Sequence, residues 1–453
     1  MDSKKLASRW YKLTPHPAQQ ALQRDRVRFK VAPCGRRSGK SECAKRHVVR
    51  EAMRAPGKYA VCAPTRDQVR RIFWQDLKAL SFAPLLPERP LEADLILRFP
   101  NTSEIHLVGL DQPARIEGVS WSGIVIDELA SVKRDAWALN VRPALDTFDP
   151  SRGGELAWAM LVGTPEGVGN TFHELAEYAR TSGDPDWKLY HWKSAEILPA
   201  AVIDAARRSL SAMQFAQEYE AEFAFATGRI YADYGDLNLT QEVASPHEQL
   251  LFAHDFNYTP MSSCIAVRRG PSFVVLDEII LRSATARMSA LEFVERYKNH
   301  KNRNVIVYGD PAGRAGEKHG LASNYTEMEQ VLRQGGWTVE RRVRAAAPAI
   351  VDRHNAVRAM ICNAAGERRL FVNPKTCPYV HKGLSTVSLK EGANGKPGSS
   401  FLEEPSDYQH VTTAVGYMVE RECPVRPEQR KLEAVPKPLH HWPAAGQWGP
   451  RTR

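Results

Sequence analysis

Apolar and polar residues follow two different periods along the first 190 residues of the chain. Short apolar runs, typical of buried strands, alternate with longer stretches whose apolar residues recur at helical spacing. This alternation is typical of a largely parallel sheet between helices, so it predicts an α/β domain. The predicted strands are residues 27–33, 59–64, 123–127 and 156–164, and residues 95–110 are expected to form a hairpin that turns at Pro100-Asn101.

A second α/β pattern follows a helical stretch near the middle of the chain. Residues 210–223 place apolar side chains at helical spacing. Beyond them come three strand-like runs, a helix-like run and a further strand, and the first three strands are expected to be antiparallel. These five segments are residues 250–257, 263–269, 273–281, 288–300 and 304–310. The predicted order is therefore βββαβ.

These patterns divide the chain into four parts. We expect a first domain over residues 1–193, a helical linker over 194–228 and a second domain over 229–422. From residue 423 the chain is rich in Pro, His and basic residues and too poor in aliphatic residues to build a core. It is predicted to be a flexible tail.

The charge of the chain favours a polyanionic partner. Its 453 residues include 62 Lys and Arg against 52 Asp and Glu, a net charge of +10 with a pI near 9.2. This excess favours nucleic acid, although a merely basic enzyme would have the same balance. No stretch approaches the roughly 18 apolar residues of a membrane span, and the N-terminus lacks the apolar run of a secretory signal. We therefore expect a cytoplasmic protein without a membrane partner, whose seven scattered cysteines are reduced.

A phosphate-binding loop is predicted at CGRRSGKS, residues 34–41, between a strand and a helix. Its backbone N–H groups, from Gly35 through Arg36, Arg37, Ser38 and Gly39, would point at phosphate. Lys40 would reach the β- and γ-phosphates of ATP, and the Ser41 hydroxyl would bind Mg²⁺. Cys34 stands where the usual pattern has its first glycine, so the motif alone is also compatible with a chance Gly-Lys-Ser.

The strand 123–127 supplies the acids that such a loop needs. It ends in Asp127-Glu128, where Asp127 would hold Mg²⁺ together with Ser41. Glu128 would orient and deprotonate the attacking water, the general-base role of an ATPase. Two acids after a strand also occur at ordinary solvated loops, but their combination with the phosphate loop favours the catalytic interpretation.

Three further features fit the same site. Gln19 precedes the first strand, where its amide would read the adenine edge or simply lie at the surface. Thr164 follows the fourth strand at the carboxyl edge of the sheet, where it could sense the γ-phosphate. Arg36, Arg37 and Arg115 are candidates for stabilising transition-state charge, and any of them could instead be a surface charge.

Strand-end carboxylates suggest a second site. Asp255 and Asp310 each close a predicted strand of the second domain, and Asp407 and His410 share one face of a predicted helix within residues 403–419. Acids that converge in a βββαβ fold suggest two Mg²⁺ or Mn²⁺ ions that cleave phosphodiesters. Strand-end acids also cap turns and helices. Asp277, Glu278, Glu403 and Glu404 are weaker candidates for the same cluster.

The two sites in this order resemble the large terminase subunit of tailed bacteriophages. The resemblance covers most of the chain and rests on HPAQQ (16–20), CGRRSGKS, CAPT (62–65), RIEGVSWSGIVIDE (115–128), VGTPEG (162–167), QFAQEYEAEF (214–223), AHDF (253–256), YGDPAG (308–313) and SDYQH (406–410). It implies a P-loop ATPase domain followed by an RNase H-like nuclease domain.

The resemblance also implies roles for individual residues. Gln19 is similar to the family's adenine reader, Thr164 to its coupling residue, and Arg115 to an arginine finger that reaches a neighbouring subunit. Asp255, Asp310 and Asp407 resemble the nuclease acids. Thr413-Ala414 stands where many relatives have Asp-Ala, which leaves the third metal ligand open between Asp407 and His410.

A protein of this family would package double-stranded DNA into a procapsid and cut it. The implied cofactors are ATP with Mg²⁺, and Mg²⁺ or Mn²⁺ for the nuclease. The implied partners are DNA, the portal protein, the small terminase subunit and copies of the chain in a ring, in the host cytoplasm and transiently at the portal vertex. The alternatives are a DNA translocase or helicase whose second domain does not cut, and a non-catalytic assembly scaffold.

Overall fold

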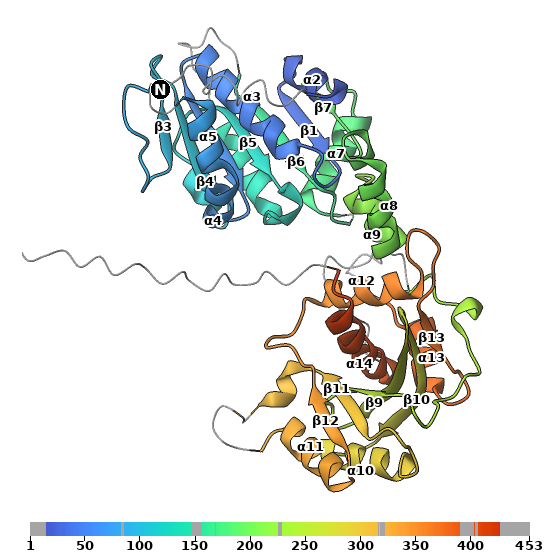
Figure 1. The fold of residues 1–453 in the computed structure, drawn as a ribbon. Coiled ribbons are helices and arrows are strands. Elements are labelled where there is room, and N and C mark those ends of the chain that lie inside the picture. Colours follow the sequence, from blue (N-terminus) through green and yellow to red (C-terminus); the bar gives the residue numbers. More distant parts are fainter. Residues whose placement is uncertain are drawn as a thin grey trace, which may run out of the picture.

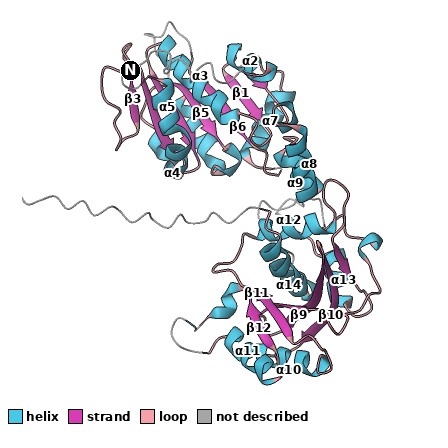
Figure 2. Cartoon of the chain, viewed as in Figure 1, coloured by secondary structure: helices cyan, strands magenta, loops and turns pink. Residues whose placement is uncertain are grey.

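The computed structural model describes residues 15–82, 86–146, 156–167, 169–224, 229–315, 317, 322–389, 403 and 406–425. Within these ranges the chain forms two α/β units joined by short helices (Figure 1). Each unit has one sheet with helices packed around it (Figure 2). The predicted α/β class is confirmed. The predicted flexible tail lies almost entirely outside the described residues.

The first unit is built on a seven-stranded sheet in the order β3-β4-β2-β5-β6-β1-β7. Its strands are parallel except β3, which pairs antiparallel with β4 and forms the predicted hairpin. The strands are β1 (Phe29–Pro33), β2 (Lys58–Ala63), β3 (Ile96–Arg98), β4 (Glu104–Gly109), β5 (Trp121–Asp127), β6 (Trp158–Gly163) and β7 (Trp187–Leu189). The last of these was not predicted from the sequence.

Helices cover both faces of this sheet because successive strand residues point to opposite sides. On β5, Val125 packs into one apolar core with α3 and α5, whereas Ile124 and Ile126 pack into the other with η5 and α7. The helices are α2 (Pro17–Arg24), α3 (Lys40–Arg54), α4 (Arg66–Val69), the π-helix η1 (Arg70–Trp74), α5 (Gln75–Leu80), the 3-10 helices η3 (Pro113–Ile116) and η4 (Leu129–Ser131), the π-helix η5 (Ala136–Val141), α6 (Arg142–Ala144) and α7 (Thr171–Thr181).

The linker consists of η7 (Ser194–Glu196), α8 (Ala200–Ser209) and α9 (Ala212–Glu218). The side chain of Ser211 accepts a hydrogen bond from the backbone of Gln214 and so begins α9. The helix ends at Glu218, five residues before the predicted end. The linker contacts the second unit through Asn363, whose side-chain amide donates to the carbonyl of Arg208 at 2.7 Å.

The second unit has a six-stranded sheet in the order β12-β11-β8-β9-β10-β13. Strands β8, β9 and β10 are antiparallel and β11 pairs parallel with β8, which confirms the predicted βββαβ order. The strands are β8 (Leu250–Asp255), β9 (Met261–Arg269), β10 (Ser272–Leu281), β11 (Asn304–Gly309), β12 (Thr338–Arg341) and β13 (Leu370–Val372). Because β8 and β11 are parallel neighbours, the residues that follow them meet at one edge of the sheet.

Helices again cover both faces of this sheet. Helices α12, α13 and α14 contribute to one core, and α10 and α11 contribute to the other. Their bounds are α10 (Ala286–Arg296), η9 (Pro311–Arg314), α11 (Asn324–Gln334), α12 (Ile350–Ile361), α13 (Pro378–Thr386) and α14 (Asp407–Glu422), and the 3-10 helix η8 (Asp236–Asn238) precedes β8. Helix α10 begins and ends earlier than the predicted 288–300.

Two expectations from composition can be compared with this fold. All seven cysteines have free thiols, five of them buried. None of the helices in the described part of the chain combines the length and apolar character needed to cross a bilayer.

Candidate functional site

The loop between β1 and α3 has the tight shape that its glycines predict. Gly39, just before α3, has a φ of +79°, a left-handed conformation that glycine adopts without steric cost. A Cβ on Gly39 would lie 2.7 Å from Gln19 Nε2, and a Cβ on Gly35 would lie 2.4 Å from Ser194 Oγ. Only glycine therefore fits these two positions without movement of a neighbour.

Cys34 extends β1 instead of shaping the loop. Its backbone N–H donates to the carbonyl of Gly163 at 2.9 Å, and it forms a parallel bridge with Trp192. The thiol is fully buried, and this burial raises its pKa. The departure from the usual motif thus places a small, neutral side chain in the core, while Gly35 and Gly39 supply the turn.

Gln19 contacts the phosphate loop on the side away from the cavity. Its side chain is 8% exposed, and its amide donates to the carbonyl of Ser38 at 3.1 Å. Gln19 does not line the cavity in front of the loop. The donor expected to read adenine is therefore engaged by the loop, and adenine recognition by Gln19 stays a prediction.

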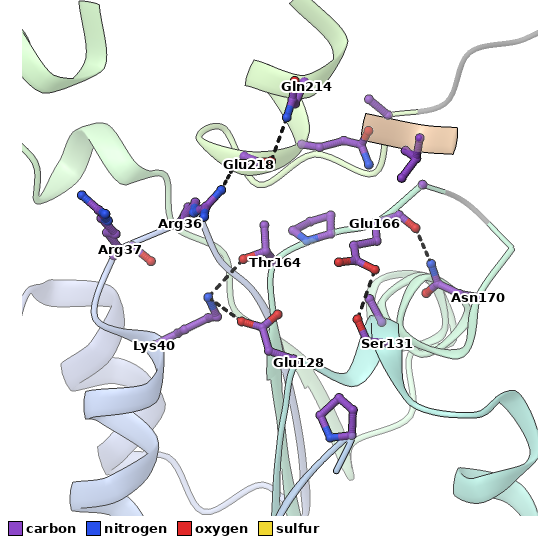
Figure 3. A pocket seen from close by; sticks show the side chains of 18 of the residues that line it. Arg36, Arg37, Lys40, Glu128, Ser131, Thr164, Glu166, Asn170, Gln214 and Glu218 are labelled. Atoms are coloured by element: carbon purple, nitrogen blue, oxygen red, sulfur yellow. Dashed lines mark hydrogen bonds and ion pairs between the residues drawn. The ribbon is translucent and has the colours of Figure 1, made fainter. Parts of the chain in front are cut away.

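The predicted catalytic pair meets the loop at the carboxyl ends of β5 and β6. Ser41 Oγ donates to Asp127 Oδ2 at 2.6 Å. Lys40 Nζ lies 3.0 Å from Glu128 Oε1 and donates to Thr164 Oγ1 at 3.0 Å (Figure 3). The structure thus brings together five residues that the sequence assigned to one ATP site.

The electrostatics of this group depend on burial. Asp127 is 1% exposed, and its burial, followed by the charge of Glu128, raises the pKa of its carboxyl. Burial lowers the pKa of Lys40, but the carboxylates of Glu128 and Asp127 outweigh this effect and raise it overall. The Ser41 hydroxyl and the Asp127 carboxylate are hard oxygen donors side by side, which is the chemistry that Mg²⁺ prefers. These two residues fit a magnesium ion.

A cavity of about 1240 Å³ opens in front of the loop. Arg36, Arg37, Lys40, Ser41, Glu128 and Thr164 line it, and its volume exceeds that of typical small-ligand pockets, about 300–1,000 Å³. Arg115 lies on η3 with an exposed side chain and does not line the cavity of its own chain.

The linker and Trp192, which precedes it, hold the loop through contacts that the sequence did not predict. Arg36 Nη1 lies 2.6 Å from Glu218 Oε2 at the end of α9 (Figure 3). Ser194 Oγ donates to the carbonyl of Arg36 at 2.7 Å, and Trp192 Nε1 donates to Ser38 Oγ at 2.9 Å. Glu218 belongs to QFAQEYEAEF, one of the segments that carry the resemblance to large terminase subunits. The segment alone did not predict that Glu218 pairs with the phosphate loop.

The second predicted site begins at the end of β8. Asp255 Oδ2 lies 2.9 Å from His410 Nδ1 on α14, and His410 Nε2 lies 3.1 Å from the side-chain amide of Asn257. The hydrogen bond that the Asp255 carboxylate accepts raises the pKa of His410, although burial opposes this effect. Asp255 and His410 therefore face each other. His410 lies near the strand-end acid Asp255, where the sequence predicted it.

Asp310 lies at the same edge, after β11. Its Oδ1 accepts a hydrogen bond from the backbone of Ala312 at 2.8 Å, which caps η9. Tyr417 of α14 lies near both Asp310 and Asp255. Burial is the main reason that the pKa of Tyr417 is raised.

Asp407 points elsewhere. It is the first residue of α14, its side chain is 48% exposed, and it forms an ion pair with Arg282. No three acidic, His or Cys side chains within the described ranges gather closely enough to form a metal-binding group. The carboxylates of Asp255 and Asp310 and the His410 ring suit a divalent ion in donor type.

The weaker acid candidates have structural partners instead. Glu278 is buried and accepts hydrogen bonds from the backbone N–H groups of Tyr379 and Val380, both at 2.8 Å, at the start of α13. Asp277 pairs with Arg296 on the other face of β10. Glu403 Oε1 lies 2.6 Å from His354 Nε2. These three acids have other partners in the fold, so their place as weaker candidates for the metal cluster stays a prediction, and Glu404 lies outside the described residues.

Curated relatives match the sequence of this chain. It is 28% identical to the large terminase subunit of Thermus virus P23-45 over 253 residues, covering 48% of this chain and 50% of the relative. It is 29% identical to that of Escherichia phage T5 over 240 residues, covering 51% and 53%. The chain thus spans about half the length of the curated relatives it matches. A comparison with protein-family models gave no match.

Solved structures match the fold over nearly the whole chain. The large terminase of a thermophilic bacteriophage superposes with a TM-score of 0.56 at 18% identity, covering 92% of this chain and 98% of that one. The same protein in complex with ATP-gamma-S gives a TM-score of 0.54 at 17% identity, over 92% and 98%. The resemblance to large terminase subunits and the predicted fold class, with two successive α/β units, are confirmed.

Proposed function

We propose that this chain is the ATP-hydrolysing and DNA-cutting subunit of a phage DNA-packaging motor. The observation that carries the proposal is the contact of Ser41 with Asp127 beside the ion pair of Lys40 with Glu128. This is the arrangement that a P-loop ATPase needs to bind Mg²⁺–ATP and to activate water. The curated relatives named large terminase subunits support the packaging role.

Each residue of the first site would have its own role in ATP hydrolysis. Ser41 and Asp127 would hold Mg²⁺, which neutralises phosphate charge when bound. Lys40 would turn from Glu128 to the phosphates, because a phosphate carries more negative charge than one carboxylate. Glu128 would then be free to take a proton from the attacking water. Thr164, which contacts Lys40, would sense the phosphate, and Arg115 of a neighbouring subunit would add positive charge if subunits form a ring.

DNA cleavage would take place at the edge of the second sheet. Asp255 and Asp310 would hold Mg²⁺ or Mn²⁺, with His410 or Asp407 as the further ligand. The net charge of +10 suits double-stranded DNA as substrate. The portal protein of a procapsid and a small terminase subunit are the proposed protein partners, in the host cytoplasm and at the portal vertex.

One observation favours a second candidate, an ATP-driven translocase that binds DNA without cutting it. Asp407 is paired with Arg282, and the described residues hold no preformed three-ligand group. Cleavage of plasmid DNA in Mn²⁺ or Mg²⁺ separates the two. The proposed function requires cleavage by the wild type, loss in Asp255→Ala, and normal cleavage by the matched control Asp236→Ala. Absence of cleavage by the wild type in both metals would leave only the translocase.

Metal binding offers a readout that does not depend on activity. Mn²⁺ should raise the melting temperature of the wild type, because it binds the native state only. Asp255→Ala should lose this shift while staying folded, although it also loses the contact with His410. If Asp255→Ala unfolds outright, Asp255 is structural and the nuclease assignment fails.

A further inference from the structure

Helix α12 of the second unit forms part of the wall of the ATP cavity. Val351, Asn355 and Arg358 line the same cavity as Lys40 and Ser41. They are spaced four and three residues apart, so they lie on one face of the helix. Helix α9 of the linker borders the cavity as well, and Figure 1 shows α9 and α12 at the junction of the two units. Both units and the linker therefore enclose one space.

Arg358 is a buried cation without a carboxylate partner among the described residues. It is 6% exposed, its Nε donates to the carbonyl of Ile230 at 2.6 Å, and its Nη1 donates to Asn355 Oδ1 at 3.1 Å. Burial lowers the pKa of this guanidinium. The other buried arginine of the same helix, Arg353, has a carboxylate, since its Nη2 lies 3.3 Å from Glu403 Oε1. Buried charges are normally paired, whereas the charge of Asp233 acts on Arg358 without forming an ion pair with it.

Gln214 lines the same cavity and carries a buried acceptor without a partner among the described residues. It is 4% exposed, and within the described part of the chain its Oε1 has no hydrogen-bond partner. Its amide nitrogen donates to Glu218 Oε1 at 3.1 Å, as Figure 3 shows. A buried polar atom without a partner costs about 1–3 kcal/mol, so a ligand that donates a hydrogen bond would stabilise this arrangement.

We propose that Arg358 and Asn355 of the second unit and Gln214 of the linker contact the nucleotide bound at the phosphate loop. The inference rests on the proposed ATP site and assigns to it residues from outside the P-loop unit. The guanidinium of Arg358 suits the anionic phosphates, and Gln214 Oε1 suits a hydroxyl or an amino group of the nucleoside. One nucleotide would then hold both α/β units of the same chain together.

Helix α12 connects this contact to the second site. Arg353 precedes Arg358 by five residues on α12, and its guanidinium carbon is 5.0 Å from the ring centroid of Tyr417. Burial raises the pKa of the Tyr417 hydroxyl, and the nearby negative charges of Asp310 and Asp255 raise it further. A nucleotide that holds α12 would therefore restrict a helix that also borders the nuclease acids.

Titration of the full-length chain with Mg²⁺ and ATPγS tests the contact. We expect Arg358→Met to weaken binding about tenfold, as the loss of one charge-assisted hydrogen bond implies. The KM for ATP should rise while kcat changes little, because a contact that holds substrate and transition state equally affects binding alone. Arg358→Lys should recover part of the affinity. Arg333→Met on α11, an exposed arginine of the same unit, is the matched control and should bind as the wild type does.

Two results would overturn the proposal. The first is binding by Arg358→Met within twofold of the wild type. The second comes from hydrogen exchange of the wild type, an experiment that does not depend on the folding of Arg358→Met. ATPγS with Mg²⁺ should protect the backbone amides of residues 350–361 from exchange. Absence of protection there would contradict the contact. Lys40→Ala distinguishes the proposed ATP site from the proposed contact of α12. If Lys40→Ala binds ATPγS normally, the proposal of an ATP site at this loop is wrong. If Lys40→Ala loses binding while Arg358→Met keeps it, only the proposed contact from α12 is wrong.

Discussion

The amino group of Lys40 lies 3.0 Å from Oε1 of Glu128, so the residue proposed to bind phosphate neutralises the residue proposed to activate water. Glu128 adopts a left-handed backbone conformation with a φ of +55°, uncommon for a residue other than glycine. This geometry aims its side chain back at the phosphate loop. In the proposed cycle, Glu128 becomes a base only when phosphate draws Lys40 away.

Glu128→Gln should keep nucleotide binding and lose turnover. Glutamine preserves the size of the side chain but cannot accept the proton, so we expect hydrolysis to fall by about 10²–10⁴-fold. Binding of ATPγS should stay within about threefold of the wild type. The exposed Glu292→Gln on α10 is the control for the loss of one charge. A normal rate of phosphate release from Glu128→Gln would remove Glu128 from the mechanism.

Arg115 should act on a neighbouring subunit. Its side chain is exposed and lies outside the cavity of its own chain, so an effect on hydrolysis requires a second copy. We expect Arg115→Ala and Lys40→Ala each to be inactive alone, and their mixture to recover part of the ATPase rate, because mixed interfaces pair an intact loop with an intact arginine. If the mixture stays as inactive as its components, a finger supplied in trans is contradicted.

The sequence predicted the fold well where the apolar period was strong. The central strands β1, β2, β5 and β6 are buried on both faces and read as continuous apolar runs, and β8 to β10 were equally clear. The three-residue strands β7 and β13 were missed because so short a run has no measurable period. Helix α9 was predicted too long because Tyr219 to Phe223 continue its apolar spacing without continuing its backbone.

Glu278 should contribute to stability and not to metal binding. It accepts two backbone hydrogen bonds at the start of α13, so Glu278→Ala leaves two buried N–H groups without partners. We expect a loss of about 1–3 kcal/mol in the free energy of unfolding, measured by urea denaturation. The exposed Glu295→Ala should change it by less than about 0.5 kcal/mol. If a folded Glu278→Ala protein loses the Mn²⁺-induced rise in melting temperature, Glu278 is a metal ligand and this prediction is wrong.

His47 should make the first unit sensitive to acid. It is buried against Trp158, and burial, followed by the charges of Lys30 and Arg50, lowers the pKa of its ring well below 6.5. Below pH 6.5 the His47 ring therefore binds a proton in the unfolded chain but not in the folded chain. Stability should be full above pH 6.5 and fall below it, by at most about 1.4 kcal/mol per pH unit. His47→Phe should flatten this dependence in thermal melts between pH 7 and 5, and an unchanged slope would contradict it.

The candidate sites were predicted residue by residue only where a motif fixes the spacing. The loop, Asp127, Glu128 and Thr164 meet because parallel strands end at one edge of a sheet. Contacts between distant segments were not predictable: the bond of Gln19 to Ser38, the pairing of Arg36 with Glu218, and the turn of Asp407 toward Arg282. Each depends on tertiary packing, which local spacing does not encode.

The rate of phosphate release from ATP in Mg²⁺ tests the central claim most directly. Lys40 is the cation at the phosphate loop, so the account predicts steady hydrolysis by the wild type and a rate at least about 100-fold lower for Lys40→Ala. The exposed Lys298→Ala should behave as the wild type. A wild-type chain that releases no phosphate, or a Lys40→Ala chain that hydrolyses ATP at the wild-type rate, would contradict an ATPase at this loop.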